Sequence, residues 1–266
     1  MQRILILLAF VGLTNCRDNT KEIKSETELS KSAINVKEDK CQEAFIKVLE
    51  VHGGLENWKK MHTLTFEIAK PNVCEKHTVD LHNKQDKIEF NEVAMGFDGN
   101  EIWLTDEQNT SKGNPVVYHN LMFYFYAMPF VLGDPGINYE TAEDLIYEGK
   151  TYPGFHISYD ENIRASPKDD YYLNYDPDTY QMARLGYTFT YGSDKKSDSV
   201  RWTRYKEWME VGDIVLLEYL TWHSYEGRNI KEAQDPFRFL MVSLDASPKQ
   251  DIFYTRPKNA KVVLKP

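Results

Sequence analysis

Short segments in which apolar and polar residues alternate follow one another along most of this 266-residue chain. In the first of them, 63–69, Leu64, Phe66 and Ile68 fall on one face. Alternation with a period of two is typical of a β-strand with one buried face. Further segments that favour strands are 73–81, 87–93, 102–104, 152–159, 170–175, 181–191, 199–211, 214–225 and 237–244.

Short turns join several of these segments, as at 97–100, 176–179 and 211–213. The Asp-Gly pair in 97–100 is a strong signal for a hairpin. About ten antiparallel strands in series predict one large meandering sheet or a partial barrel. A single β domain of about 225 residues is ordinary in size. We therefore predict a mainly β (α+β) fold in one domain, residues 41–266.

An amphipathic helix is expected before the first strand. Apolar residues recur there at spacings of three and four, namely Cys41, Ala44, Phe45, Val48 and Leu49. Asp39 is the expected N-cap. His52-Gly53-Gly54 is expected to end the helix, because glycine adopts the left-handed conformation of a helix C-terminus at little cost. A second short helical turn is expected at 55–60.

Residues 116–132 interrupt the β pattern. The segment carries no charged side chain and is apolar or aromatic around its circumference. Pro129 is expected to end or kink a helix there. Such a helix must be buried on all sides or face a hydrophobic ligand. Two alternatives remain open: a core helix beneath the sheet, or a lid over an apolar cavity.

The N-terminal residues have the pattern of an export signal. A basic start at Arg3 is followed by the apolar run 4–13 and then by Cys16. As a helix the run would be about 15 Å long, whereas a bilayer core needs about 20 residues. We therefore predict that residues 1–15 are a signal peptide.

Leu13-Thr14-Asn15-Cys16 resembles a bacterial lipobox, in which the cysteine is acylated and becomes the first residue. Asn15 departs from that pattern, since Gly, Ala or Ser is usual before the cysteine. The alternative, an ordinary signal cut at an Ala-x-Ala site, lacks such a site. We expect Cys16 to carry a lipid, and the polar residues 17–40 to form a flexible tether. Such a tether spans about 25–30 Å on average.

Composition argues against one class of partner. The formal net charge is −9, and removal of residues 1–15 takes away one arginine and no acid. Nucleic-acid binding rewards basic surfaces, so we expect no nucleic-acid partner. The 17 tyrosines and 13 phenylalanines suit a β-rich fold whose pockets have apolar walls with polar tips.

Two cysteines remain once Cys16 is assigned to the anchor. In an oxidising compartment Cys41 and Cys74 could form a disulfide. The alternative is two buried thiols that act as small apolar side chains.

Several short motifs, in this order, resemble a group of uncharacterised Bacteroidota-type lipoproteins. They are 52–55 with Trp58, 64–66, 128–132, 134–136 and 170–176. The group is similar to lipoprotein carriers of the LolA type and to related lipid-binding lipoproteins. The resemblance implies a curved antiparallel sheet, an unclosed LolA-like half-barrel with helices on its concave side, where lipid chains bind. Soluble LolA carriers lack an acyl anchor, whereas this chain is predicted to have one.

No constellation of residues indicates catalysis. The seven histidines form neither His-x-His nor His-Glu-x-x-His, so zinc is unsupported. No Gly-x-Ser-x-Gly elbow and no phosphate-binding glycine loop is present. His52 is expected to end a helix rather than to act as a base. We predict that the protein is not an enzyme and has no cofactor, metal or catalytic residue.

The leading hypothesis is a monomeric, membrane-anchored lipoprotein of a Gram-negative cell envelope, at the outer rather than the inner membrane. It would bind a lipid or another hydrophobic small molecule in the half-barrel. The residues expected to form the cavity or its lid are Trp103, Leu121, Phe125, Met128 and Phe130. One alternative is a structural or partner-binding lipoprotein with a packed core. A weaker one is a secreted glycan hydrolase, which would need two carboxylates about 5–10 Å apart in a cleft.

Overall fold

The computed structural model describes residues 41–111, 113–159, 169–190 and 195–263. The predicted signal peptide, the lipidation site Cys16, the tether and the N-cap Asp39 lie outside these residues.

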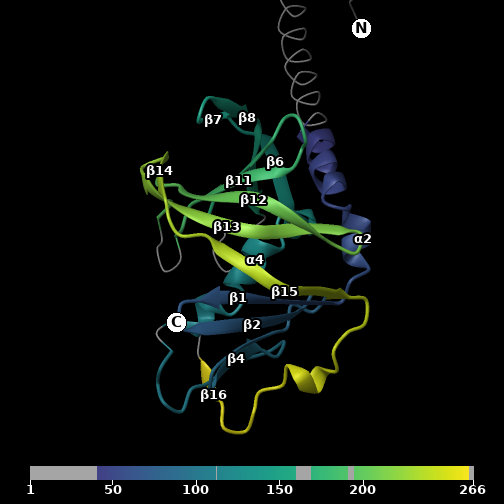
Figure 1. The fold of residues 1–266 in the computed structure, drawn as a ribbon, viewed down its shortest axis with the longest axis vertical. Helices are drawn as coiled ribbons and strands as arrows, with labels where there is room; N and C mark the ends of the chain where they lie inside the picture. Colours follow the sequence, from purple (N-terminus) through teal and green to yellow (C-terminus); the bar gives the residue numbers. More distant parts are fainter. Residues whose placement is uncertain (1–40, 112, 160–168, 191–194, 264–266) are drawn as a thin grey trace, which may run out of the picture.

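One antiparallel sheet dominates the fold (Figure 1). From one edge to the other its strands are β16 (Lys261–Val263), β5 (Ile102–Thr105), β4 (Val93–Phe97), β3 (Asp86–Phe90), β2 (Val73–Asp80), β1 (Thr63–Lys70), β15 (Phe237–Asp245), β13 (Ile214–Glu226), β12 (Arg201–Val211), β11 (Met182–Tyr187), β10 (Tyr171–Tyr175), β9 (Gly154–Tyr159) and β6 (Ile137–Thr141). β14 (Asn229–Ala233) pairs with β13, and β7 (Leu145–Tyr147) with β8 (Lys150–Tyr152) forms a separate hairpin.

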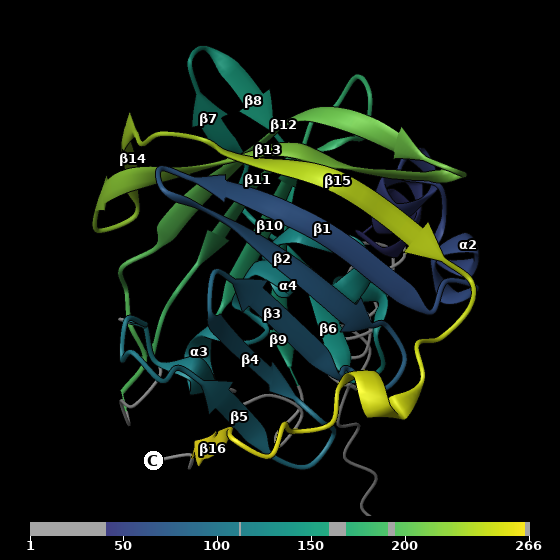
Figure 2. The same cartoon turned by 60° about the horizontal axis from the view of Figure 1, so that its bottom comes forward.

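The sheet bends around its helices but does not close. Its edge strands, β16 and β6, are not hydrogen-bonded to each other. In Figure 2 strands β1 to β4 lie in front, while α4 (Leu121–Tyr126), β9 and β10 lie behind them. The side chains of these two layers meet in one apolar cluster. The predicted mainly β fold with an unclosed antiparallel half-barrel is therefore confirmed.

The expected first helix is present at 41–51, and its apolar face is buried. Gly53 and Gly54 end it with φ angles of 103° and 84°. The amide of Gly54 donates to the Leu49 carbonyl at 2.8 Å, the kind of bond that satisfies a helix C-terminus. α2 (Leu55–Lys59) follows directly and buries Trp58.

The uncharged segment forms three short pieces instead of one helix. These are α3 (Pro115–Tyr118), α4 and the 3-10 helix η1 (Phe130–Gly133), with a cis peptide bond before Pro129. We call residues 115–133 the plug, because they fill the space between the two layers of the sheet. Nearly all plug side chains from 122 to 132 are buried.

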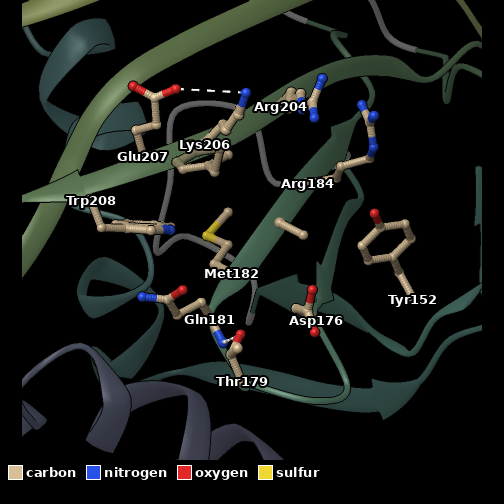
Figure 3. A pocket seen from close by; sticks show the side chains of 12 residues that line it. Tyr152, Asp176, Thr179, Gln181, Met182, Arg184, Arg204, Lys206, Glu207 and Trp208 are labelled. Atoms are coloured by element: carbon tan, nitrogen blue, oxygen red, sulfur yellow. Dashed lines mark hydrogen bonds and ion pairs between the residues drawn. The ribbon is translucent and has the colours of Figure 1, made fainter. Parts of the chain in front are cut away.

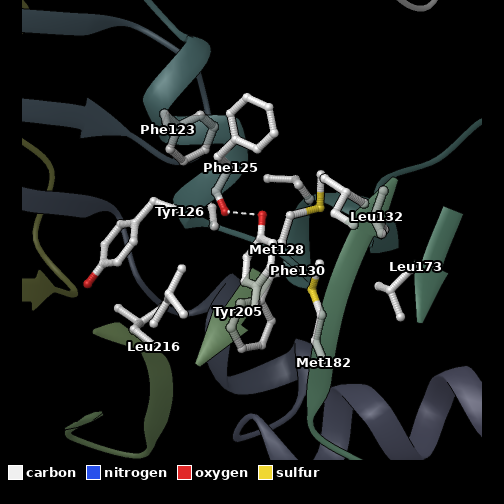
Figure 4. Packing of buried hydrophobic residues seen from close by; sticks show 14 of the residues in the cluster. Phe123, Phe125, Tyr126, Met128, Phe130, Leu132, Leu173, Met182, Tyr205 and Leu216 are labelled. Atoms are coloured by element: carbon white, nitrogen blue, oxygen red, sulfur yellow. Dashed lines mark hydrogen bonds between the residues drawn. The ribbon is translucent and has the colours of Figure 1, made fainter. Parts of the chain in front are cut away.

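Aromatic contacts hold the plug in place, and Figure 4 shows its buried side chains Phe125, Met128 and Phe130 beside Tyr205 of the sheet. Phe130 stacks on Trp58 with ring centroids 4.6 Å apart, and Tyr126 stacks on Phe239 at 4.0 Å. The Tyr205 hydroxyl donates to the carbonyl of Phe125 at 2.8 Å. Of the two alternatives for residues 116–132, the structure therefore has the packed core segment and not a lid over an open cavity.

Some predicted strands differ from the observed ones. Residues 87–93 divide between β3 and β4, because Asn91 takes a left-handed turn conformation with φ of 48°. Pro153 separates β8 from β9 within 152–159, since proline lacks the amide that a ladder needs. β6, β7, β14 and β16 were not predicted; they are short and largely exposed, so apolar alternation is weak in them. Among the helices described, none is long and apolar enough to cross a bilayer.

Candidate functional site

Four of the five predicted cavity residues lie together on the plug. Phe125, Met128 and Phe130 are between 0 and 6% exposed, and Leu121 packs against the same cluster. Phe125 contacts the rings of Tyr187 and Trp222 on the sheet, with centroids 5.2 and 5.3 Å away. These side chains fill the concave side, so a ligand there would have to displace some of them. Their ligand-binding role stays a prediction.

Trp103 is not brought together with the other four. It lies opposite Gly96 on β4, which lies opposite Lys87 on β3. Register partners share a face, and this face is the convex one, covered by the C-terminal segment. The indole amine of Trp103 donates to the Tyr254 carbonyl at 3.1 Å. Trp103 therefore fixes the C-terminal segment to the outside of the sheet.

The two remaining cysteines are free thiols in different surroundings. Cys41 is buried in the core, and burial raises the pKa of its thiol. Cys74 is exposed on β2, where its thiol donates to Glu67 at 3.3 Å. No disulfide joins the pair, and only Cys41 is a buried thiol, so neither alternative describes both cysteines.

His52 joins three distant parts of the chain. Its side chain is fully buried, its Nε2 accepts the Met182 amide at 3.2 Å, and its Nδ1 lies 3.3 Å from the Val215 carbonyl. Nδ1 therefore carries the hydrogen, and the ring is neutral. Burial lowers the pKa of His52 to about 4. This is the structural role expected for His52, at the end of the first helix, rather than that of a base.

A polar cluster fastens α3 to the sheet. The Glu75 carboxylate receives hydrogen bonds from Lys70 at 2.5 Å and from the Tyr118 hydroxyl at 2.6 Å. Burial by itself would raise the pKa of Glu75, but the His77 ring 3.5 Å away and the hydrogen bonds from Lys70 and Tyr118 outweigh it and lower that pKa to about 2. A carboxylate held ionised in this way anchors the start of the plug.

A second buried acid supports the same element. The Asp86 carboxylate lies 2.7 Å from Nδ1 of His119, just after α3. Burial raises the pKa of Asp86 to about 6, although the contact with His119 opposes this. Sequence reasoning missed both clusters, because Tyr118 and His119 lie more than 30 positions from the acids Glu75 and Asp86 that they contact.

A groove opens where β11 and β12 separate (Figure 3). The two strands pair only from Arg184 opposite Arg204 to Tyr187 opposite Arg201. Beyond Arg204, β12 continues without β11 beside it, which leaves a groove of about 240 Å³. Its lining is Tyr152, Asp176, Thr179, Gln181, Met182, Ala183, Arg184, Arg204, Tyr205, Lys206, Glu207 and Trp208.

The floor of the groove reaches the core. Met182 and Trp208 line it, and both contact His52, with the Trp208 and His52 rings 4.2 Å apart. The His52 ring in turn meets Phe130 edge to face, at 6.5 Å. One layer of side chains therefore separates the groove from the plug.

The rim of the groove is charged. Asp176 is 2.6 Å from Lys150, and Glu207 is 3.6 Å from Lys206. Glu207 has a φ of 65°, a conformation that is uncommon for residues other than glycine. Burial lowers the pKa of Arg184, which is only 2% exposed. The groove thus combines apolar floor residues with walls that carry charges of both signs.

Metal ligation has no support in the part of the chain that the structure describes, since no three His, Cys, Asp or Glu residues there are grouped to hold an ion.

The described architecture is that of an unclosed antiparallel half-barrel with a helical plug. The chain belongs to a family of unknown function, DUF6503, whose model matches residues 64–228. No curated protein matches the sequence.

Solved structures with similar folds include LolA superfamily members, the group to which the sequence motifs pointed. A LolA superfamily protein from Nitrosomonas europaea is 8% identical with a TM-score of 0.49, covering 81% of this chain and 97% of that one. A DUF1329 family protein from Desulfovibrio piger is 8% identical with a TM-score of 0.47 and the same coverage. A domain described as an outer membrane lipoprotein-sorting protein, from Vibrio parahaemolyticus, is 7% identical with a TM-score of 0.41, covering 76% and 97%. At these scores the likenesses carry no argument about ligands.

Proposed function

We propose that this protein is a non-catalytic lipoprotein of a Gram-negative cell envelope that binds a lipid or another apolar ligand on the concave side of its half-barrel. The predicted acyl anchor on Cys16 and the tether 17–40 would hold the domain, residues 41–266, at one membrane, the outer rather than the inner one. A tethered domain of this kind would act there as a receiver, donor or sensor of lipid.

The observation that carries this proposal is the construction of the plug. Its residues form no strand of the sheet and bury aromatic and methionine side chains between the two layers. Exposed residues precede it at 107–110 and follow it at 134–135. Removal of the plug from the concave side would therefore leave the strand ladders intact and would expose an apolar surface.

An acyl chain could replace the plug's apolar contacts at modest cost. Burial of a CH₂ group gains about 0.8 kcal/mol, so a C16 chain gains on the order of 10 kcal/mol before the entropic cost of binding. The buried hydroxyl of Tyr126 has no hydrogen-bond partner among the described residues. Such a group costs about 1–3 kcal/mol, so its exposure on plug movement would offset part of the cost.

The packed state of the core favours a second candidate. Phe125, Met128 and Phe130 are buried by neighbouring side chains, as expected of a structural or partner-binding lipoprotein. In that case the plug is a permanent part of the core, and no ligand enters.

Native mass spectrometry separates the two candidates. We would extract a Cys16→Ser variant, which lacks the acylation site and needs no detergent, and weigh the folded protein. If the protein binds an apolar ligand, we expect a bound lipid in stoichiometric amount and saturable uptake of an apolar fluorescent probe. A folded variant with neither lipid nor probe would contradict the proposal and favour the packed alternative.

A pair of matched substitutions locates the site. Leu121→Glu places a charge at the partly buried edge of the plug, whereas Ile146→Glu places one on β7, where Ile146 is 74% exposed. Probe uptake is expected to fall in the first variant and to stay unchanged in the second. Equal effects of the two would argue against binding at the plug.

A further inference from the structure

Two arginines lie directly opposite each other at the open end of the groove. Arg184 on β11 and Arg204 on β12 are register partners. The neighbouring Leu185 and Tyr187 belong to the core cluster, so the two arginines face the other, convex side of the sheet. Like charges in directly opposed positions destabilise a sheet, which makes this pair unfavourable unless something negative lies between them.

Arg184 is buried, and no described residue forms an ion pair with it. Its guanidinium lies 3.8 Å above the ring of Tyr147 on β7, and its Nη1 lies 3.4 Å from Nε2 of His223. His223 Nδ1 lies 2.9 Å from the Lys231 carbonyl, to which it donates, so Nε2 is free to accept from Arg184. The arginine is thus held in a defined orientation by neutral groups.

Two of the nearby carboxylates are already paired, and a third, Glu148 between β7 and β8, acts on Arg184 from beyond ion-pair distance and raises its pKa. Asp176 pairs with Lys150, and Glu207 pairs with Lys206. Among the described residues no carboxylate lies within ion-pair distance of Arg184 or Arg204. Burial of a charge without a close counter-ion is costly, so an anion bound beside the two arginines would stabilise this site.

We infer that the groove between β11 and β12 binds a phosphate group, held between the guanidinium groups of Arg184 and Arg204. Arginine forks match phosphate oxygens with paired hydrogen bonds. The apolar floor of Met182 and Trp208 accepts the uncharged part of an amphiphile. The phosphate comes from a lipid head group or from a free phosphate. The site lies outside the half-barrel, so it does not depend on an apolar ligand at the plug.

Calorimetry with inorganic phosphate tests the inference directly. The titrations use the purified protein at low ionic strength, with sodium chloride of matched ionic strength as the reference. Saturable phosphate binding is expected, and Arg204→Gln should weaken it at least about tenfold, since a hydrogen bond to a charged group contributes about 1.5–3 kcal/mol. Arg204 is partly exposed, so its replacement leaves the core intact.

Arg238→Gln is the matched control, because Arg238 lies on β15 and pairs with Glu218 away from the groove. Its phosphate affinity should equal that of the wild type.

A comparison of vesicles of phosphatidylglycerol with vesicles of phosphatidylcholine identifies the source of the phosphate group. Binding to phosphatidylglycerol vesicles that Arg204→Gln weakens and Arg238→Gln preserves assigns a lipid head group, and binding of phosphate alone assigns a free phosphate. Failure of both probes, or equal binding by both variants, overturns the inference.

Discussion

His52 shows at the scale of one residue how a histidine can serve structure rather than chemistry. Its ring ties the end of the first helix to the start of β11 and the start of β13. Because both ring nitrogens are used in the neutral form, protonation would break the bond from the Met182 amide. The same burial that makes the ring a structural link makes the fold sensitive to acid.

The stability of the fold should therefore fall as pH falls from 6.5 to about 4. His52 has its ordinary pKa of 6.5 in the unfolded chain and one of about 4 in the folded chain. Between these values the unfolded state binds more protons than the folded state. The free energy of unfolding therefore decreases as the pH falls, by roughly 3 kcal/mol at most. Urea denaturation at a series of pH values measures it, and a His52→Gln variant should lose this part of the pH dependence. An identical pH profile in the variant would contradict the assignment.

Gly53 and Gly54 form a matched pair at the end of the first helix. Both have positive φ, but a Cβ on Gly53 would lie 2.1 Å from the Asp213 carbonyl oxygen, whereas one on Gly54 meets nothing within 4 Å. Gly54→Ala should cost about 1–3 kcal/mol for the backbone conformation alone, because a φ of 84° with a ψ of 143° suits glycine and few other residues. Gly53→Ala should cost about 1–3 kcal/mol more, because the turn before β13 must move. Chemical denaturation compares them, and equal costs would show that the close approach is unimportant.

At the scale of elements, the plug depends on side chains from distant strands. The Tyr205 hydroxyl from β12 satisfies the carbonyl of Phe125 at the end of α4, and the Tyr139 hydroxyl from β6 satisfies that of Leu132. Short helices leave many carbonyls unpaired. These two tyrosines therefore supply partners that the plug cannot supply itself.

Tyr205→Phe should destabilise the protein by about 1–3 kcal/mol, because it leaves a buried carbonyl without a donor. The midpoint of urea unfolding measures the change. Tyr225→Phe is the control, since Tyr225 is 40% exposed, and its effect should be close to zero. A Tyr205→Phe midpoint equal to that of the wild type would mean that the hydroxyl does not hold the plug.

At the scale of the whole molecule, the domain and its anchor are predicted to be separable. Residues 17–40, with few apolar side chains, are predicted to be a tether. Removal of residues 1–35 should therefore leave the midpoint of urea unfolding unchanged, while it moves the protein from the membrane fraction to the soluble one. A Cys16→Ser variant should be released in the same way and should incorporate no labelled acyl chain. Acyl labelling that persists in this variant would contradict the lipidation site.

Chain order alone gives no indication of the central pairing in the sheet. β15 inserts between β1 and β13, so that Leu64 lies opposite Leu244. A simple meander of consecutive strands would have placed β15 at an edge. Local alternation tells which residues face the core, but it carries no information about which strand lies beside which.

The sequence by itself determined the mainly β fold, the buried face of the first helix, and its end at Gly53-Gly54. Each of these follows from residues adjacent in the chain, where periodicity and backbone preference act directly. Only the tertiary structure decided that Trp103 faces away from the plug, that His52 bonds to strands more than 100 residues away, and that Arg184 lies opposite Arg204. These outcomes depend on strand register, which long-range packing selects and which no local pattern of residues encodes.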